Sequence, residues 1–315
     1  MDAELAAIIA RPFSFEPGDP VGAGASADVF TEHTGIQTLG RDALTISDRL
    51  IPGPEAAPDV GVRIYDPPGR TDPAPCFMYF HGGGFIAGDL DTEDIRCVRL
   101  ANDVGCVVVS VDYRLAPQHP FPAAIDDCYA ALQWTASMVE HLGIDATRLG
   151  VGGPSAGGAL AAAIALMARD RGGPTLAFQL LVYPCLDDRA RTVSMGFVGT
   201  PIVDGGSVAW LWNAYLGEDR SNVSPYAAPA RADELGGLPP AYVMTAELDP
   251  LRDEGIEYAM RLLHAGVSVE LHQFAGAFHG FDLLPTAISR RAADEQVDWL
   301  RAITQRAPDH RGEAR

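Results

Sequence analysis

One stretch of this 315-residue chain decides its fold: RLGVGGPSAGGALAAAIALMARD, residues 148–170. A short apolar run leads into a tight turn, Gly153-Pro154-Ser155-Ala156-Gly157-Gly158, and an alanine-rich helical segment follows. The G-x-S-x-G pattern between a strand and a helix is that of a nucleophile elbow, which presents a serine hydroxyl at the top of a sheet. Side chains at Gly153 or Gly157 would collide with adjacent elements in such a turn. Because the pattern also fits a plain glycine-rich turn, its partners must be found elsewhere in the chain.

The rest of the chain alternates short apolar runs with helical stretches. The runs expected as strands are Leu44–Ile51, Val60–Tyr65, Cys76–Phe80, Cys106–Val111, Leu149–Gly152, Phe178–Tyr183, Ala241–Thr245 and Val267–Phe274. The stretches expected as helices are Thr92–Val104, Ala123–Glu140, Ala156–Asp170, Arg252–Leu263 and Thr286–Thr304. Almost continuous hydrophobicity is typical of a strand covered on both faces. The chain is therefore expected to be an α/β protein with a parallel sheet between helices and a ligand site at the carboxyl ends of the strands.

Two regions interrupt this alternation. The N-terminal residues contain a short helix candidate, Glu4–Ala10, followed by coil rich in proline and glycine. The interval from about Asp187 to Pro229 contains an aromatic-rich helix candidate, Ser207–Leu216. An insertion of this size after a strand is typical of a lid, and an ordinary surface excursion is the alternative.

Composition excludes several classes of protein. The chain has 23 Lys+Arg against 42 Asp+Glu, a net charge of −19, which argues against nucleic-acid and anionic-membrane binding. Hydrophobic residues make up 47%, too many for a disordered chain. The acidic N-terminus does not resemble a signal peptide, and the longest apolar stretch, Ala159–Ala168, is about half of a membrane span. We therefore expect a soluble, cytoplasmic protein.

The cysteines give no sign of a disulfide framework or a metal site. Their positions are scattered and form no CxxC pair: Cys76, Cys97, Cys106, Cys128 and Cys185. This usage favours reduced, buried thiols. A nucleophilic cysteine is the alternative.

The first partner of the elbow is the sequence His81-Gly82-Gly83-Gly84-Phe85, directly after an apolar run. Consecutive glycines let backbone N–H groups approach a ligand, and oxyanion donors of this kind stabilise a transition state by about 3 kcal/mol each. We assign the oxyanion hole to the amides of Gly83, Gly84 and Ala156. A phosphate-cradling loop is the rival, but no lysine follows and no GxGxxG spacing is present. His81 is expected to brace the loop.

The second partner is an acid on the loop that leaves a strand, and the third is a histidine. Asp249 fits the acid best, with Glu247 and Asp253 as alternatives. His279 is expected as the base because it lies in a loop just past the last strand. The other histidines considered lie in coil, on helix surfaces or in a strand: His33, His141, His264, His310 and His272. The order Ser155, Asp249, His279 is that of α/β-hydrolases.

These motifs together resemble the hormone-sensitive-lipase-like esterases, the bacterial family IV carboxylesterases of the α/β-hydrolase fold. The matching stretches are HGGGF (81–85), SVDYRLAPQHPFPAA (110–124), GPSAGG (153–158), DPLRDEG (249–255) and FHGFD (278–282). The resemblance implies a single domain over residues 1–315, with an eight-stranded, mostly parallel sheet flanked by helices and an antiparallel second strand. It also implies a helical cap built from about 1–45 and 188–225, and often a dimer formed through the last strand.

One position departs from the family pattern. The residue before the serine is usually Asp, or Thr in a sister group, whereas this chain has Pro154. Proline removes a hydrogen-bonding side chain and an N–H donor, but the oxyanion amide belongs to Ala156. Gln118, where the family often has Glu, is a milder change.

The chain is accordingly expected to be a serine carboxylesterase that needs no metal or organic cofactor. Ser155 attacks the ester, His279 takes its proton and Asp249 orients the imidazole. Activity should rise through about pH 6–7, because the base must be neutral. Phe85, Trp210 and Phe197 are expected to line a pocket for short- to medium-chain, neutral esters. An amidase or arylformamidase with the same triad, and a non-catalytic receptor of the same fold, are the alternatives.

Overall fold

The computed structural model describes residues 1–9 and 40–305, in which an eight-stranded sheet forms the middle layer. The strands are β1 (Thr45–Ile51), β2 (Val60–Asp66), β3 (Ala74–Phe80), β4 (Val107–Asp112), β5 (Ile144–Pro154), β6 (Phe178–Val182), β7 (Ala241–Ala246) and β8 (Val269–Phe274). Their order is β1-β2-β4-β3-β5-β6-β7-β8. β2 is antiparallel to β1 and β4, and all other neighbours are parallel. The predicted sheet and its antiparallel second strand are confirmed.

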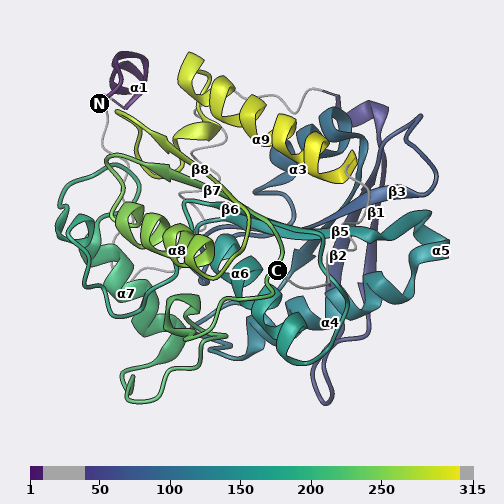
Figure 1. Ribbon diagram of the computed structural model, residues 1–315, viewed down its shortest axis with the longest axis horizontal. Coiled ribbons are helices and arrows are strands. Elements are labelled where there is room, and N and C mark those ends of the chain that lie inside the picture. The colour runs from purple at the N-terminus through teal and green to yellow at the C-terminus, as the bar shows by residue number, and fades with distance from the viewer. Residues whose placement is uncertain (10–39, 306–315) are drawn as a thin grey trace.

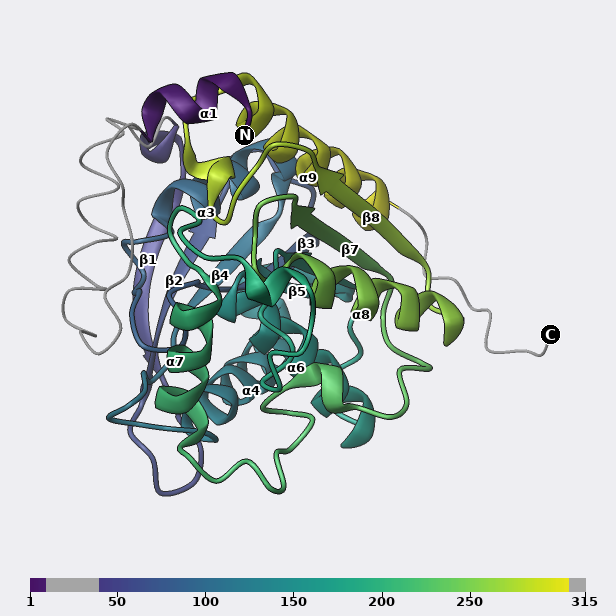
Figure 2. The same ribbon diagram turned by 90° about the vertical axis from the view of Figure 1, so that its left-hand side faces the viewer.

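Helices cover both faces of this sheet (Figures 1 and 2). One face carries α3 (Asp94–Leu100), which continues into the π-helical turn η2 (Ala101–Gly105), and α9 (Ala287–Gln305). The other carries α4 (Ala123–Ser137), α6 (Ala156–Asp170) and α8 (Arg252–His264). The shorter elements are α1 (Ala3–Ile8), α5 (Val139–Leu142), α7 (Gly205–Leu216), η1 (Arg41–Ala43), η3 (Ser194–Gly196), η4 (Pro229–Arg231) and η5 (Phe281–Leu283). Within the described ranges, no helix combines the length and the apolar character that crossing a membrane requires.

Several element boundaries differ from those predicted, most of them by one or two residues, and two of the differences are larger. The helix expected over Ala123–Glu140 breaks at Met138 into α4 and α5. Ser137 Oγ donates to Trp134 O (2.7 Å), and such side-chain bonds to the helix backbone compete with continuation of the helix. β5 begins at Ile144 rather than Leu149, because Ile144 pairs with Ala74 of β3, and residues 145–148 form an irregularity before the next pair, Leu149 with Cys76.

The element order places the chemistry-bearing motifs at one edge of the sheet. The elbow follows β5, the HGGGF loop follows β3, and the acid and histidine loops follow β7 and β8. Because these strands are parallel, their carboxyl ends meet at the same edge.

The insertion after β6 contains α7, which packs on the HGGGF loop. The Phe85 ring stacks on Tyr215 of α7 at 4.0 Å between centroids. Of the expected N-terminal cap segment, residues 10–39 lie outside the described residues. The described part begins with α1, where Asp2 N donates to Gly276 O (2.9 Å) in the loop that follows β8.

Candidate active site

Ser155 lies where β5 turns into α6. Its backbone has φ +56° and ψ −117°, a strained conformation that costs of order 1–3 kcal/mol for a residue with a side chain. Between Leu149 and Ala168, Ser155 is the one residue that is not buried. The turn therefore presents a single side chain to solvent, at a helix N-terminus that favours developing negative charge.

Glycines on both sides of Ser155 let the end of β3 approach the turn closely. A Cβ on Gly153 would lie 2.0 Å from Phe80 O, and a Cβ on Gly157 would lie 1.9 Å from the same oxygen. Backbone cannot yield to such contacts without moving β3. The predicted reason for glycine at these two positions is therefore confirmed.

The HGGGF loop offers amide donors beside this turn. Gly83 and Gly84 have φ of +107° and +62°, values that favour glycine. Among the described residues, the N–H groups of Gly83 and Gly84 donate to no protein acceptor. Ala156 is the first residue of α6, so its N–H has no acceptor within the helix. An anion at the elbow could therefore be met by backbone donors from both segments.

His81 supports the loop from inside the protein. Its fully buried ring stacks on Tyr113 at 4.0 Å between centroids, and Tyr113 Oη donates to His81 O (2.8 Å). Burial lowers the pKa of His81, so the imidazole is neutral near pH 7. These contacts fit a brace and leave no role in proton transfer.

His279 and Asp249 are joined by a buried hydrogen bond. His279 Nδ1 lies 2.8 Å from Asp249 Oδ2, and the Asp249 side chain is completely buried. Leu251 N donates to Asp249 Oδ1 (2.8 Å), which fixes the carboxylate. This is the arrangement in which a carboxylate orients a histidine base.

The two alternative carboxylates are engaged elsewhere. Glu247 Oε2 accepts from Gly276 N (2.6 Å), and Asp253 Oδ2 accepts from Ser194 N (2.8 Å) in the insertion. Of the three candidate acids, the structure brings only Asp249 to His279.

Tyr183 connects the imidazole with the elbow. It directly follows β6, whose Val182 O accepts from Ser155 N (2.9 Å), and its ring centroid is 4.6 Å from that of His279. The hydrogen bonds among the described residues do not include one between Ser155 Oγ and His279. In structures without substrate such catalytic bonds are often long, and they shorten on binding.

The residues expected to line the acyl pocket lie in different environments. The Phe85 side chain is only 1% exposed, because α7 covers it. Trp210 in α7 and Phe197 are partly exposed, and the Arg252 guanidinium lies 5.0 Å above the Phe197 ring. Phe85 therefore acts as packing between the loop and α7 in this structure, rather than as an open pocket wall.

The cysteines of this chain are poorly suited to act as nucleophiles. All five cysteines are buried and unpaired. Burial raises the pKa of these thiols, that of Cys106 to about 12, so none is a ready thiolate near neutral pH. Across residues 1–9 and 40–305, no group of three or more His, Cys, Asp or Glu side chains could hold a metal ion.

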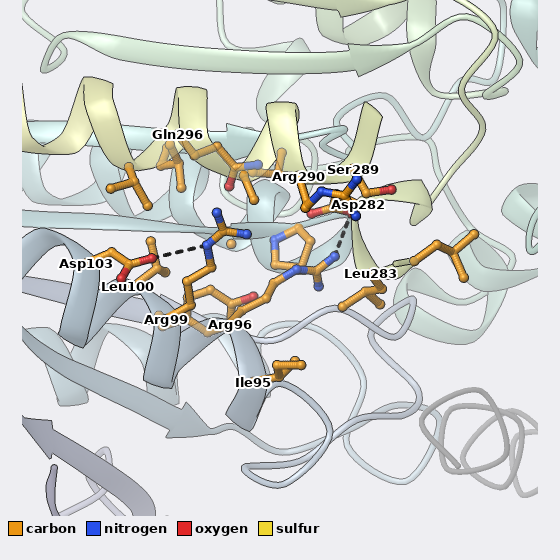
Figure 3. Close-up of a pocket in the computed structure, with 18 of the residues that line it drawn as sticks. Ile95, Arg96, Arg99, Leu100, Asp103, Asp282, Leu283, Ser289, Arg290 and Gln296 are labelled. Atoms are coloured by element: carbon orange, nitrogen blue, oxygen red, sulfur yellow. Dashed lines mark hydrogen bonds and ion pairs between the residues drawn. The ribbon is translucent and has the colours of Figure 1, made fainter. Parts of the chain in front are cut away.

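The structure shows a polar cluster that the sequence did not single out. Arg96, Tyr183 and Asp282 meet beside the His279 loop. The available signals were an arginine inside an apolar-faced helical segment and a tyrosine at the end of a buried strand. The cluster borders a cavity of about 490 Å³ between α3 and α9, which Pro154 also lines (Figure 3). The unusual proline thus faces this cavity, behind the elbow.

Several known proteins that are similar to this chain in sequence and structure are named esterases. A family model described as the alpha/beta hydrolase fold matches residues 77–283. The chain is 48% identical to Esterase LipI of Mycobacterium tuberculosis over 242 residues, which cover 76% of this chain and 75% of that protein. It is 38% identical to an ethyl acetate hydrolase of Pseudomonas putida over 241 residues, 74% of each protein. The solved structure of a bacterial heroin esterase superposes with a TM-score of 0.92 at 43% identity, covering 97% of this chain and 98% of the other. The chain therefore belongs to the α/β-hydrolase family, in its hormone-sensitive-lipase-like branch.

Proposed function

We propose that Ser155, His279 and Asp249 form the catalytic triad of this enzyme. The protein is a carboxylic ester hydrolase, as its family and the names of its relatives indicate. The observation that carries the residue assignment is the buried His279–Asp249 hydrogen bond, at the same sheet edge as Ser155, the one residue of the elbow that is not buried.

The reaction follows from these positions in two half-reactions. Ser155 Oγ attacks the ester carbonyl carbon while His279 Nε2 takes the hydroxyl proton, and the amides of Gly83, Gly84 and Ala156 hold the resulting oxyanion. The alcohol leaves with the proton from His279, which gives the acyl-enzyme. Water, deprotonated by His279, then attacks the acyl carbon, the bond to Ser155 Oγ breaks as His279 returns the proton to that oxygen, and the carboxylic acid is released. Asp249 stabilises the imidazolium formed in each half-reaction.

We further propose that the segment 188–225 caps the site and limits the acyl chain. A Cβ on Gly84 would lie 2.5 Å from the Leu211 side chain, so α7 packs directly on the oxyanion loop. Leu211, Trp212 and Tyr215 of α7 are buried and offer no broad apolar surface for a long chain. In this proposal Trp210 and Phe197 line the acyl pocket, and Phe85 shapes it from behind.

An acyl-chain series tests this proposal. With p-nitrophenyl esters from acetate to dodecanoate, we expect kcat/KM to be highest near butyrate or hexanoate and to fall at least about tenfold by dodecanoate, because longer chains find no further apolar wall. Initial rates measured below the micellar range of each ester provide the check. A maximum at decanoate or dodecanoate would contradict the limit that we assign to α7.

The anilide of butyric acid separates esterase from amidase activity at the same triad. We expect p-nitrobutyranilide to react at least about 100-fold more slowly than p-nitrophenyl butyrate. An anilide rate equal to or above the ester rate would make the enzyme an amidase, and the absence of both rates would favour a binding protein.

We also propose that the enzyme forms a dimer through its last strand, β8. β8 is an edge strand and can pair with β8 of a second copy. Sedimentation of the purified enzyme should then give the mass of a dimer, and the mass of a single copy would refute the proposal.

We also propose that the enzyme resides in the cytoplasm. Its five buried, unpaired thiols suit a reducing compartment of this kind. Recovery of the protein from another compartment on cell fractionation would refute that placement.

A further inference from the structure

Beside His279 lies a cluster of buried polar side chains that the reaction described above does not use. Arg96 Nη2 in α3 donates to Tyr183 Oη (2.6 Å) and to Asp282 Oδ1 (2.8 Å). Arg96 Nη1 pairs with Glu93 Oε2 (2.5 Å). Tyr183 Oη donates to Asp282 Oδ1 (2.7 Å), which closes the cluster. Figure 3 shows Arg96 extending from α3 to Asp282 at the border of the cavity.

Stability alone does not account for so many buried charges. The side chains of Asp282 and Glu93 are 3% and 7% exposed, and Tyr183 is 2% exposed. Removing ionised groups from water is costly, and apolar residues of similar size are often at least as stabilising. Burial also raises the pKa of Tyr183 well above its usual range, so the phenol keeps its proton and donates to Asp282. What the cluster provides is a fixed geometry.

That geometry is imposed on Tyr183, whose backbone is strained. Its φ of +35° is rare for a residue with a side chain, and Tyr183 N is held by Met244 O (2.7 Å). Such strain persists where the surroundings impose it, and it concentrates at functional sites. The Tyr183 ring lies against the imidazole of His279, tilted by 57°. The ring thus occupies the space into which the imidazole would otherwise swing.

The same cluster also holds the loop that carries His279. Asp282 follows His279 by three residues and is bound to α3 through Arg96. On the other side of His279, Ala277 O accepts from Leu248 N (2.8 Å) of the acid loop. The imidazole is therefore fixed from both ends of its loop as well as by its bond to Asp249.

We infer that Tyr183 is a positioning residue for His279, with Arg96 and Asp282 holding its ring in place. The inference rests on the proposed role of His279 as the base. The bond to Asp249 fixes Nδ1 but leaves the imidazole ring able to tilt about it, and the Tyr183 ring sets the direction in which Nε2 points. A displacement of about 1 Å can lower a rate by about 100-fold.

Two substitutions of Tyr183 test separately how its ring and its hydroxyl affect kcat. With p-nitrophenyl butyrate, Y183L is expected to lower kcat about 100-fold and Y183F about tenfold, with KM within about twofold of the wild type in both. Phenylalanine restores the ring but not the bond to Asp282, so it should recover part of the loss. A fall confined to KM, or equal losses in both variants, would overturn the inference.

Tyr79 provides a matched control. Its hydroxyl is also buried and donates to Glu93 Oε2 (2.9 Å), the other carboxylate partner of Arg96, and its ring centroid lies near Phe77, at 6.1 Å, rather than His279. Y79F therefore removes a comparable hydrogen bond without touching the imidazole. We expect its kcat within about twofold of the wild type at a similar loss of thermal stability. A tenfold loss of kcat in Y79F would show that the cluster only supports the structure and does not position His279.

The imidazole proton gives a readout that does not depend on turnover. In the wild type and in Y79F, the Nδ1 proton between His279 and Asp249 is expected as one sharp downfield ¹H resonance, and in Y183L as a broadened or missing one. A sharp, unshifted resonance in a folded Y183L would refute positioning. If the wild type hydrolysed no ester, the proposed function would fail, whereas this measurement would still decide the role of Tyr183.

Discussion

Replacing Ser155 with alanine is expected to abolish ester hydrolysis, lowering kcat for p-nitrophenyl butyrate by about 10⁵- to 10⁶-fold. The Ser155 hydroxyl oxygen is the atom that forms the acyl-enzyme bond, and none of the cysteines can replace it, because they are buried with raised pKa values. Ser155 is the N-cap of α6 but makes no side-chain capping bond, so S155A should lose no stability through the helix. Rates measured on purified, folded S155A give the answer.

A glycine variant at the same position separates chemistry from strain. S155G also lacks the nucleophile, but glycine adopts a φ of +56° without the cost that alanine bears. We expect S155G to be more stable than S155A by about 1 kcal/mol in urea unfolding, with both inactive. A variant of either kind that kept the wild-type rate would remove Ser155 from the mechanism.

The second large effect is expected for D249N, with a fall in kcat of about 10⁴-fold. Asp249 Oδ2 accepts the Nδ1 proton of His279 at 2.8 Å. An asparagine amide can present its N–H₂ group there instead, which places the imidazole proton on Nε2 and leaves no lone pair to receive the proton of Ser155. The imidazolium also loses its buried counter-charge. The measurement is kcat and KM for the same ester.

The neighbouring carboxylates supply the controls for D249N. Glu247 is exposed and binds Gly276 N, and Asp253 binds Ser194 N, so neither bears on His279. E247Q and D253N are expected to keep kcat within about threefold of the wild type. If either lost as much activity as D249N, the acid would have to be reassigned.

Much of the fold could be predicted because its signals are local. β3 reads as a continuous apolar run, and every residue of the strand is buried. The stretch 156–168 is apolar throughout, and every residue of this part of α6 is buried. The boundaries that were wrong depend on weaker forces. At Met138 a single serine side chain interrupts the helix, and β5 starts early because Ile144 pairs with Ala74 of β3 across an irregularity at residues 145–148, where the apolar run is broken.

The candidate active site could likewise be predicted from the sequence only in part. The sequence by itself determined that this chain builds an elbow around Ser155, a glycine loop beside it, and an acid and a histidine in the order of α/β-hydrolases, because each of these is encoded by neighbouring residues. Only the tertiary structure decided which of Glu247, Asp249 and Asp253 meets His279, since the three lie within seven positions and differ only in where the loop points them.

The tertiary structure also decided what surrounds the imidazole. The cluster beside His279 combines a helix, a strand end and a loop that are far apart in the sequence, through Arg96, Tyr183 and Asp282. No local sequence pattern around one of these residues predicts the other two. α7 likewise turns the Phe85 side chain into buried packing, although its position after the glycine loop suggested a pocket wall. Contacts of this kind arise from packing between elements, so short-range sequence patterns do not contain them.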